Sequence, residues 1–344
     1  MTLGLSVIQA RQSKLSLVTA SPLDSYLESL RAQSGIPGMS AALVQDGEIV
    51  WERGFGFQNL ESRIRATPDS PYPVADISET LAAVLVLQCA EQRRLGVDED
   101  INRLGGSLEQ HATVRQVLNH TSAGTPGESF RFDAERYAQL TPVVERCLPQ
   151  PYRKSVAANI LERLAMKDSV PGRDLVDPTI LTEKIFADEV VERYQHVLER
   201  MAIPYKVDKR ARATRNEISA EGINAATGLV TTVRDYARFD AALDQHLLLK
   251  EETLSVAWSN SYNSQRAVLP MGLGWFVQTY RGEPVVWHFG MIVNGYSSLI
   301  VKLPTRHLTF ILFANSDGLA STAQLDAGDV TRSLFATLFL RLYL

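Results

Sequence analysis

Short apolar runs bounded by turn residues occur near the start of the chain and in its last third, and they predict β-strands in both places. Near the start, Met39–Val44 and Glu48–Phe55 are two such runs, and Asp46-Gly47 between them is typical of a hairpin turn. Four runs in the last third predict further strands, over residues 274–280, 284–288, 296–302 and 308–314.

Apolar residues three and four positions apart predict a long helix over Ile77–Arg94, with Leu81, Val84 and Leu85 on one face. The same kind of spacing predicts seven other helices: Pro22–Gln33, Thr113–Leu118, Ala134–Cys147, Ser155–Leu164, Ile180–Phe186, Glu189–Leu198 and Asp326–Leu342.

This order of elements predicts one antiparallel sheet that is built from both ends of the chain, with a helical region inserted between them. We expect an N-terminal arm over 1–20, a discontinuous sheet domain over 21–75 and 225–344, and a helical subdomain over 76–224. A ligand site is expected in the cleft between the two parts.

The charge balance argues against two classes of partner. The chain has 344 residues, and its 35 Lys and Arg against 39 Asp and Glu give a formal charge of −4. A nucleic-acid binder or a polybasic membrane anchor would need a basic face. The N-terminus lacks the apolar core of a secretory signal and no apolar run is long enough to span a bilayer, so we expect a soluble cytoplasmic protein.

The two cysteines lie far apart in the sequence. Cys89 falls in the apolar run LAAVLVLQCAEQ and is interpreted as a small core residue, and Cys147 follows much later. We therefore expect neither a disulfide framework nor a zinc site. Histidines and carboxylates do not fall at metal-ligand spacing and no dinucleotide fingerprint is present, so no cofactor is expected.

Several segments in family order carry a resemblance that spans nearly the whole chain: IPGMSAALVQDGEIVWERGFG, YPVADISETLAAVLVLQCAEQRRLGVDEDI, VRQVLNHTSAG, GLVTTVRDYARF, MGLGW and WHFG followed by YSSLIVKLPTRHLTFILFANSDG. With them the chain resembles the serine β-lactamase and penicillin-binding-protein superfamily, in its class C-like branch of esterases and D-peptidases. The resemblance implies an α+β (α/β) fold of the β-lactamase/transpeptidase type. That fold has an antiparallel five-stranded sheet flanked by helices and an inserted all-helical subdomain.

The family's chemistry uses a Ser-x-x-Lys motif at the start of the long helix, where the lysine activates the serine for attack on an acyl carbon. In this sequence the corresponding window is Asp76-Ile77-Ser78-Glu79, with aspartate and glutamate at the two reactive positions. Ser78 does not restore the motif, because Leu81 stands three residues after it.

The family's second motif, Tyr-x-Asn, aligns with Phe132-Asp133-Ala134, which lacks the proton-relaying hydroxyl. Tyr137 is a nearby substitute, more than one helical turn away. The third motif, which frames the oxyanion hole and binds substrate, is kept as His288-Phe289-Gly290. The resemblance thus implies loss of the nucleophile, the base and the relay.

Two interpretations of Asp76 and Glu79 stay open. An Asp-x-x-Glu pattern before an apolar run is typical of a capping box at a helix start. The resemblance instead places both acids at the floor of the cleft, where two desolvated carboxylates form an acid–base pair. Asp76 as a covalent nucleophile is a further option that we rank lower, because Glu79 is no evident base for it.

Other candidate site residues follow from the resemblance. His288 is either a substrate-facing catalytic residue or a buried, hydrogen-bonded histidine. His120 is expected to belong to a structural turn. Candidate substrate-binding residues are Phe132, Tyr137, Trp275, Phe289 and Gly290.

Three functions remain as alternatives. The first is an enzyme repurposed for non-covalent general acid/base chemistry (isomerisation, cyclisation, elimination or addition) on a small organic metabolite, as in natural-product assembly. The second is a pseudoenzyme that binds a ligand or partner in the old cleft. The third is an esterase, peptidase or β-lactamase that uses another nucleophile, or an ordinary hydrolase with introduced changes at 76 and 79. The sequence predicts no oligomeric state.

Overall fold

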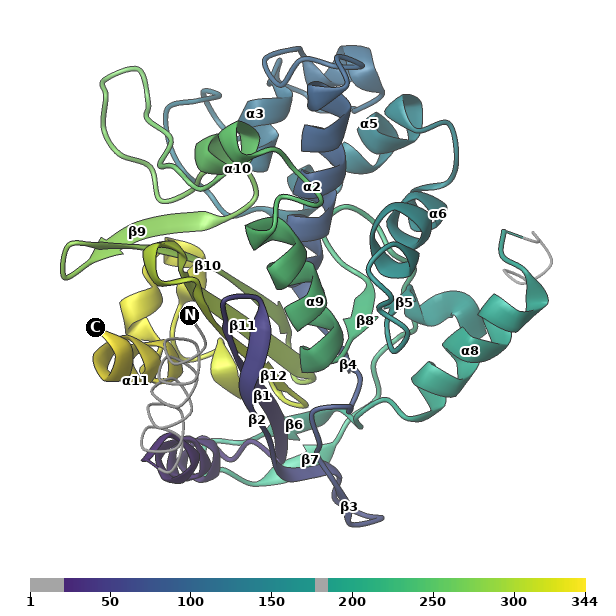
Figure 1. Cartoon of the computed structure of the whole chain (residues 1–344), viewed down its shortest axis with the longest axis vertical. Helices are drawn as coiled ribbons and strands as arrows, with labels where there is room; N and C mark the ends of the chain where they lie inside the picture. Colours follow the sequence, from purple (N-terminus) through teal and green to yellow (C-terminus); the bar gives the residue numbers. More distant parts are fainter. Residues whose placement is uncertain (1–21, 177–184) are drawn as a thin grey trace, which may run out of the picture.

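The computed structural model describes residues 22–176 and 185–344. Its largest element is an antiparallel sheet of seven strands in the order β3-β2-β1-β12-β11-β10-β9 (Figure 1). The predicted α+β class is confirmed, but the sheet has seven strands where the resemblance implied five: the six apolar runs of the sequence all join it, and the short β3 adds one more at the edge. The strands are β1 (Gly38–Gln45), β2 (Glu48–Asn59), β3 (Ile64–Arg65), β9 (Phe276–Tyr280), β10 (Glu283–Ile292), β11 (Tyr296–Leu303) and β12 (Leu308–Ala314).

The predicted hairpin at the start of the chain is confirmed. Gln45 of β1 pairs with Glu48 of β2 across a two-residue turn. Asp46 and Gly47 both have positive φ, +53° and +79°, as the hairpin turn that suits the twist of two strands requires. The other edge of β1 pairs with β12, so strands from both ends of the chain lie side by side in the sheet (Figure 1).

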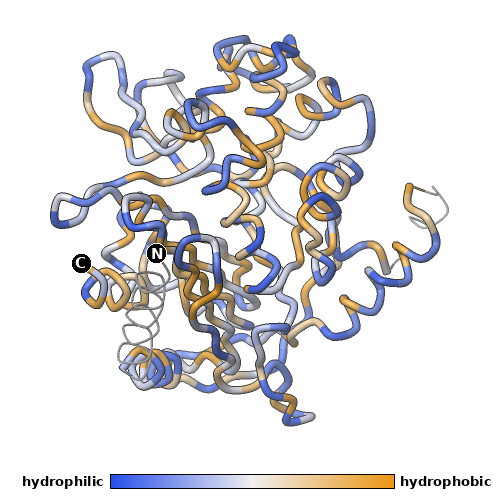
Figure 2. Tube along the Cα trace, in the orientation of Figure 1, coloured by the Kyte–Doolittle hydropathy of each residue, from blue (hydrophilic) through white to orange (hydrophobic). Residues whose placement is uncertain are grey.

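Helices cover both faces of the sheet. Because side chains alternate along a strand, Phe310 and Phe313 of β12 point to opposite faces. Phe310 stacks on Phe339 of α11 (Leu334–Tyr343) at 5.1 Å between ring centroids, whereas Phe313 meets Tyr236 of α9 (Val233–Asp244) at 6.0 Å. Figure 2 shows the hydrophobic stretches gathered in these strands and helices, with hydrophilic loops around them.

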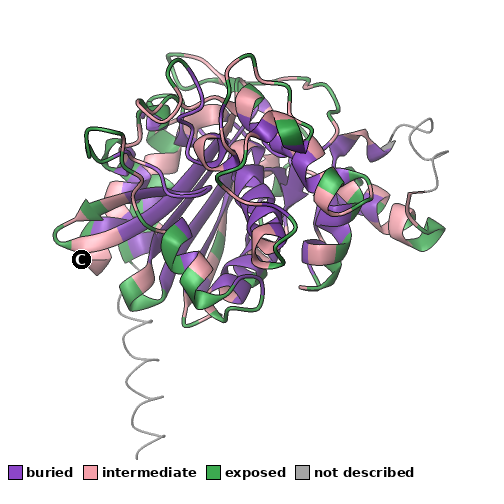
Figure 3. Ribbon diagram, turned by 90° about the horizontal axis from the view of Figure 1, so that it is seen from above, coloured by how far each residue is buried: buried purple, intermediate pink, exposed green. Residues whose placement is uncertain are grey.

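The helix α2 (Ser78–Glu91) runs through the middle of the molecule and is apolar around its whole circumference. Every residue from Leu81 to Leu87 is buried. A helix of this kind is stable only inside a core, and Figure 3 shows the buried residues gathered in the sheet and the helices at the centre of the molecule, with exposed residues around them. The remaining helices are α3 (Val114–Leu118), α4 (Ala134–Tyr137), α5 (Leu140–Cys147), α6 (Tyr152–Val156), α8 (Asp188–Glu199), α9 (Val233–Asp244), α10 (Glu251–Ala257) and α11 (Leu334–Tyr343).

Two small sheets join these parts. Strand β8 (Leu229–Thr231) lies between β4 (Tyr72–Pro73) and β5 (Val170–Pro171), and β6 (Tyr205–Val207) pairs with β7 (Ala213–Arg215). Residues 22–33 form a helix, as predicted. The predicted arm over 1–20 and most of the predicted helix over 180–186 lie outside the described residues. The domain boundaries at 76 and 225 stay a prediction.

The expectation for the cysteines was wrong. Cys89 near the end of α2 and Cys147 at the end of α5 form a disulfide, with their Cα atoms 6.3 Å apart. The two cysteines are far apart in the sequence, so the sequence did not indicate this pairing. In the fold they come together because α2 and α5 pack directly against each other. Cys89 is buried, as predicted.

Candidate functional site

The first candidate residue, Asp76, sits in a short 3₁₀ turn (η1, Ala75–Ile77) that leads into α2. Its Oδ2 accepts a hydrogen bond of 3.0 Å from the backbone N–H of Met291 on β10. No side chain caps the start of α2, so the capping-box interpretation was wrong. A tertiary contact is the reason, because the carboxylate of Asp76 points away from the helix and toward β10.

Gly290 makes this approach of β10 to η1 possible. A Cβ atom at this position would lie 2.2 Å from the carbonyl oxygen of Val74 and 2.9 Å from the backbone nitrogen of Asp76. The glycine of the third motif is thus required for the close backbone contact that brings Met291 to Asp76.

Glu79, one position into α2, is fully buried and faces two histidines. Its Oε2 lies 2.9 Å from Nε2 of His120 and 3.3 Å from Nε2 of His288. The side chains of Glu79 and His288 have no solvent exposure. Among the described residues, Glu79 Oε1 has no hydrogen-bond partner. The structure therefore joins two predicted catalytic residues and adds His120, which the sequence placed in the scaffold.

Backbone contacts decide which ring nitrogens carry protons. The N–H of Asp133 donates to Nδ1 of His120 at 3.0 Å, so the neutral ring carries its proton on Nε2 and donates it to Glu79. Nδ1 of His288 lies 2.7 Å from the carbonyl oxygen of Phe289, to which it donates. The Nε2 atom of His288 is therefore the ring nitrogen that faces Glu79, at 3.3 Å.

Aromatic rings cover this cluster. Phe132 and Tyr137 stack on His120, with centroids 4.4 and 5.0 Å away. The hydroxyl of Tyr137 donates to the backbone carbonyl of Glu79 at 3.0 Å. Phe289 is buried and its ring lies 5.1 Å from that of Phe132. Three of the predicted binding residues thus lie at the site, where they enclose the titratable groups.

Burial shifts the pKa of each group away from its usual value. Desolvation raises the pKa of Asp76 to about 6, although the N–H of Met291 opposes it. Desolvation also raises the pKa of Glu79 to about 8, with His288 opposing, and it lowers the pKa of His120 to about 3. Near pH 7, Asp76 is mainly ionised, Glu79 mainly protonated and His120 neutral.

Ser78, the only serine of the window, has its hydroxyl engaged in the scaffold. Its Oγ donates to the carbonyl of Ala75 at 2.7 Å and accepts from the N–H of Leu229 at 3.2 Å. The residue is buried. Ser78 therefore serves the packing of α2 against β8.

A family model for β-lactamases matches residues 23–332, which is most of the chain. The chain belongs to the β-lactamase family. Members of this family bind small-molecule substrates.

Curated relatives of this β-lactamase-family chain are distant. Protein flp of Staphylococcus aureus is 21% identical over 183 residues, which cover 42% of this chain and 36% of that protein. Unguisins hydrolase ungD' of Aspergillus campestris is 26% identical over 336 residues, covering 84% of this chain and 60% of the relative. The chain thus spans between about a third and three fifths of the length of these relatives.

Solved structures share the fold. The octameric penicillin-binding protein homologue from Pyrococcus abyssi superposes with a TM-score of 0.74 at 20% identity, over 94% of this chain and 77% of that one. The D-amino acid amidase from Ochrobactrum anthropi superposes with a TM-score of 0.70 at 19% identity, over 94% and 99% of the two chains. A class C β-lactamase gives the same TM-score and identity, over 94% and 96%.

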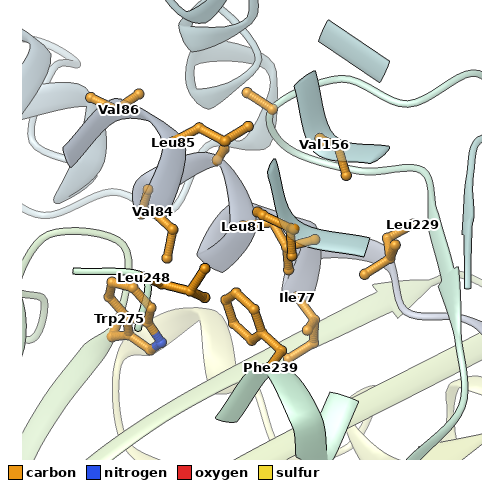
Figure 4. Close-up of a cluster of buried hydrophobic side chains, with 14 of the residues drawn as sticks. Ile77, Leu81, Val84, Leu85, Val86, Val156, Leu229, Phe239, Leu248 and Trp275 are labelled. Atoms are coloured by element: carbon orange, nitrogen blue, oxygen red, sulfur yellow. The ribbon is translucent and has the colours of Figure 1, made fainter. Parts of the chain in front are cut away.

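Trp275 is the predicted binding residue that this β-lactamase-family fold places elsewhere. It is buried and packs edge-to-face on Trp258, 6.4 Å away. Figure 4 shows it among the apolar side chains beneath α2, near Val84 and Leu248. The position just before β9 turns its side chain into the core, away from the cluster around Glu79.

His120 was expected to belong to a structural turn, and its ring lies in that turn but also contacts Glu79. It lies in Asn119-His120-Thr121-Ser122 with a φ of +54°, a left-handed conformation that is uncommon outside glycine. The one feature of the sequence that could have indicated its contact with Glu79 is a histidine in a turn that precedes the second motif. Within residues 22–176 and 185–344, no group of His, Cys, Asp and Glu is arranged to hold a metal ion. No described helix is long and apolar enough to cross a membrane.

Proposed function

We propose that this chain is a β-lactamase-family enzyme that has lost the serine acyl-enzyme route and transfers protons to and from a small organic substrate. Asp76 and Glu79 stand where the family's Ser-x-x-Lys motif has its serine and lysine. Neither carboxylate can repeat the attack of a serine that a lysine activates. The reactions open to such an acid–base pair are isomerisation, cyclisation, elimination and addition.

The proposal rests on the different environments of the two acids, Asp76 and Glu79. Asp76 is partly exposed, whereas Glu79 and His288 behind it are fully buried. The raised pKa of Asp76, about 6, lies close to neutrality, where a group both takes and returns protons efficiently. Two carboxyls with separated pKa values are typical of acid–base sites.

In this proposal Asp76 is the group that touches substrate. Its carboxylate removes a proton from a carbon or oxygen of the substrate, and the resulting acid returns a proton to another position. The N–H of Met291 stabilises the charged form of Asp76 before the transfer. Glu79 and His288 lie 3.3 Å apart in the buried part of the site, and Glu79 holds a proton near neutral pH because burial raises its pKa to about 8.

We propose a carbonyl-containing metabolite as the substrate class, because a carbonyl acidifies the neighbouring C–H. The names of the similar proteins, an unguisins hydrolase and a D-amino acid amidase, support acyl compounds as a starting set. Fold likeness by itself does not assign an activity.

The test follows proton exchange, so it detects turnover even where the product is unidentified. A library of small carbonyl compounds is incubated with the full chain in D₂O, and mass spectrometry detects deuterium uptake or a new product. We expect Asp76→Asn to lower the rate at least about 100-fold, the usual contribution of a positioned acid or base. Asp326→Asn, an exposed aspartate, is the matched control and should keep the wild-type rate.

A pseudoenzyme is the second candidate, and the burial of Glu79 and His288 favours it. In that case a ligand would raise the melting temperature while neither product nor deuterium exchange is found. Wild-type protein that binds but never exchanges, with Asp76→Asn behaving identically, would replace our proposal by this one.

A hydrolase with another nucleophile is the third candidate. Fluorophosphonate and penicillin probes followed by intact-mass measurement test for it, and we expect no adduct because the hydroxyl of Ser78 is engaged. An adduct on Asp76 would instead support its role as a covalent nucleophile.

The cytoplasmic location expected from the N-terminal sequence stays a prediction. The Cys89–Cys147 disulfide favours an oxidising compartment, because cytosolic thiols are usually kept reduced. Fractionation of the source cells, with alkylation of free thiols before lysis, distinguishes the two.

A further inference from the structure

We propose that His120 is a positioning residue: its ring holds the carboxyl of Glu79 in one orientation, facing His288. This inference rests on the proposed function, since it assigns a part in the same proton transfer. It extends that function to a residue outside the three reactive motifs of the family.

The first support is that His120 has no free ring nitrogen. Its Nδ1 accepts the N–H of Asp133 at 3.0 Å, and its Nε2 donates to Oε2 of Glu79 at 2.9 Å. A backbone N–H can only donate, so a proton on Nδ1 would face another hydrogen. The ring is therefore a fixed donor to Glu79 and cannot itself carry the transferred proton.

The second support is how firmly the backbone holds this ring. The N–H of Arg131 donates to the carbonyl of His120 at 2.9 Å, two residues before Asp133 makes its bond. Asp133 in turn caps α4, where its carboxylate accepts the N–H of Arg136. The left-handed φ of His120 is a strained conformation that this set of bonds maintains.

The third support is the aromatic sandwich. Phe132 and Tyr137 lie on the two faces of the His120 ring, both with interplanar angles of 22°. They prevent the ring from rotating and exclude water, and the burial lowers the pKa of His120 to about 3. His120 thus stays neutral while its neighbours titrate.

With His120 fixed as a donor, the group that titrates in this cluster is the carboxyl of Glu79, whose Oε2 lies 3.3 Å from Nε2 of His288. Nε2 of His288 has no hydrogen-bond partner among the described residues, so the bond from His120 is the one that orients this carboxyl. The other groups whose charge acts on Glu79 are Asp76 and Asp133, and the phenols of Tyr137 and Tyr152 lie nearby.

The test reads ring protonation directly, by ¹⁵N NMR of the full chain with labelled histidine between pH 5 and 9. We expect His120 to show a bare Nδ1 and a protonated Nε2 throughout, while the signals of His288 change near the titration of Glu79. Two variants separate positioning from packing: His120→Gln keeps a donor toward Glu79, and His120→Phe keeps only the stacked ring.

We expect His120→Phe to raise the pH midpoint of the Glu79 titration, which the nearby His288 signals report, by about one pH unit, because the carboxylate loses a hydrogen bond to its charged form. His120→Gln should restore most of the wild-type midpoint. A His120 ring that is protonated on Nδ1, or that titrates between pH 5 and 8, would overturn the inference, and this measurement stands even if a variant fails to fold. Equal midpoints in wild type and His120→Phe would overturn it too.

The two proposals fail separately. The NMR readout requires no substrate, so absent turnover with the expected His120 signals would remove the proposed function and leave the positioning of Glu79 supported. Turnover that depends on Asp76, with unchanged midpoints in His120→Phe, would overturn only the role of His120.

Discussion

Glu79 and His288 lie 3.3 Å apart, Oε2 to Nε2, and neither side chain reaches solvent. The pair comes from the start of α2 and from β10, elements that are far apart in the chain. A buried acid whose pKa is raised makes the stability of the fold depend on pH.

The first prediction is that stability falls as pH rises from 6.5 to 8. The raised pKa of Glu79, about 8 against a usual 4.5, means that the folded chain binds more protons than the unfolded chain in this window. Asp76 acts in the same direction only up to about pH 6, and His120 acts in the opposite direction only below 6.5. We expect a loss of about 2 kcal/mol between pH 6.5 and 8 in urea unfolding, at about 1.4 kcal/mol per pH unit.

Glu79→Gln is the matched variant, because it keeps the shape and removes the titration. Its unfolding free energy should be flat across the same window, while Asp76→Asn should keep the wild-type slope. The same slope in wild type and Glu79→Gln would contradict the assignment to Glu79.

The second prediction concerns the close contact at Gly290. In Gly290→Ala the added methyl would lie 2.2 Å from the carbonyl of Val74, so β10 must move away from η1. We expect a loss of about 1–3 kcal/mol, as for other overpacked sites, with shifted amide signals for Asp76 and Met291. Gly96→Ala is the control, since its methyl meets only the flexible side chain of Glu99. Unshifted signals in Gly290→Ala would argue against the contact.

The third prediction concerns the disulfide. Thiol titration of the denatured, unreduced chain should find no free cysteine among Cys89 and Cys147. The double variant Cys89→Ala, Cys147→Ala should lose about 2–4 kcal/mol of stability, because the bond closes a loop of 58 residues. Wild type treated with a reductant should lose a similar amount, and the double variant should not respond to the reductant.

The fourth prediction concerns Lys302, which is buried between β11 and α9. Its Nζ donates to Asp240 at 2.9 Å, to Asp244 at 2.8 Å and to Thr309 at 3.0 Å. Lys302→Met leaves buried carboxylates unpaired and should cost about 3–5 kcal/mol. Adding Asp240→Asn and Asp244→Asn should recover part of this loss; a Lys302→Met variant as stable as wild type would show that the lysine acts by packing alone.

Local patterns were enough to predict the six long strands of the main sheet, but not the short strands β3 to β8. The run over 308–314 matches β12 at both ends, and Asp46-Gly47 predicted the turn between β1 and β2. In these segments the turn chemistry and the burial pattern act over a few residues, so sequence carries the information. The predicted helix Ala134–Cys147 is divided into α4 and α5, which a continuous apolar spacing does not reveal.

The site depended on contacts between distant segments. A capping box was a sound local interpretation of Asp76 and Glu79, yet the N–H of Met291 and the ring of His120 attract the two carboxylates instead. The pairing of Cys89 with Cys147 has the same origin. Such contacts follow from the packing of α2, which apolar spacing shows to be buried without showing its neighbours.

The position of β1 between β2 and β12 has a consequence for biosynthesis. Met39 of β1 pairs with Ala314 of β12, so the edge of β1 that faces β12 has no pairing strand until the ribosome has translated residues 308–314. Until then the nascent chain exposes unpaired backbone N–H and C=O groups along an apolar strand. Production of this protein should therefore respond to chaperones that shield nascent chains more than to changes in its surface loops.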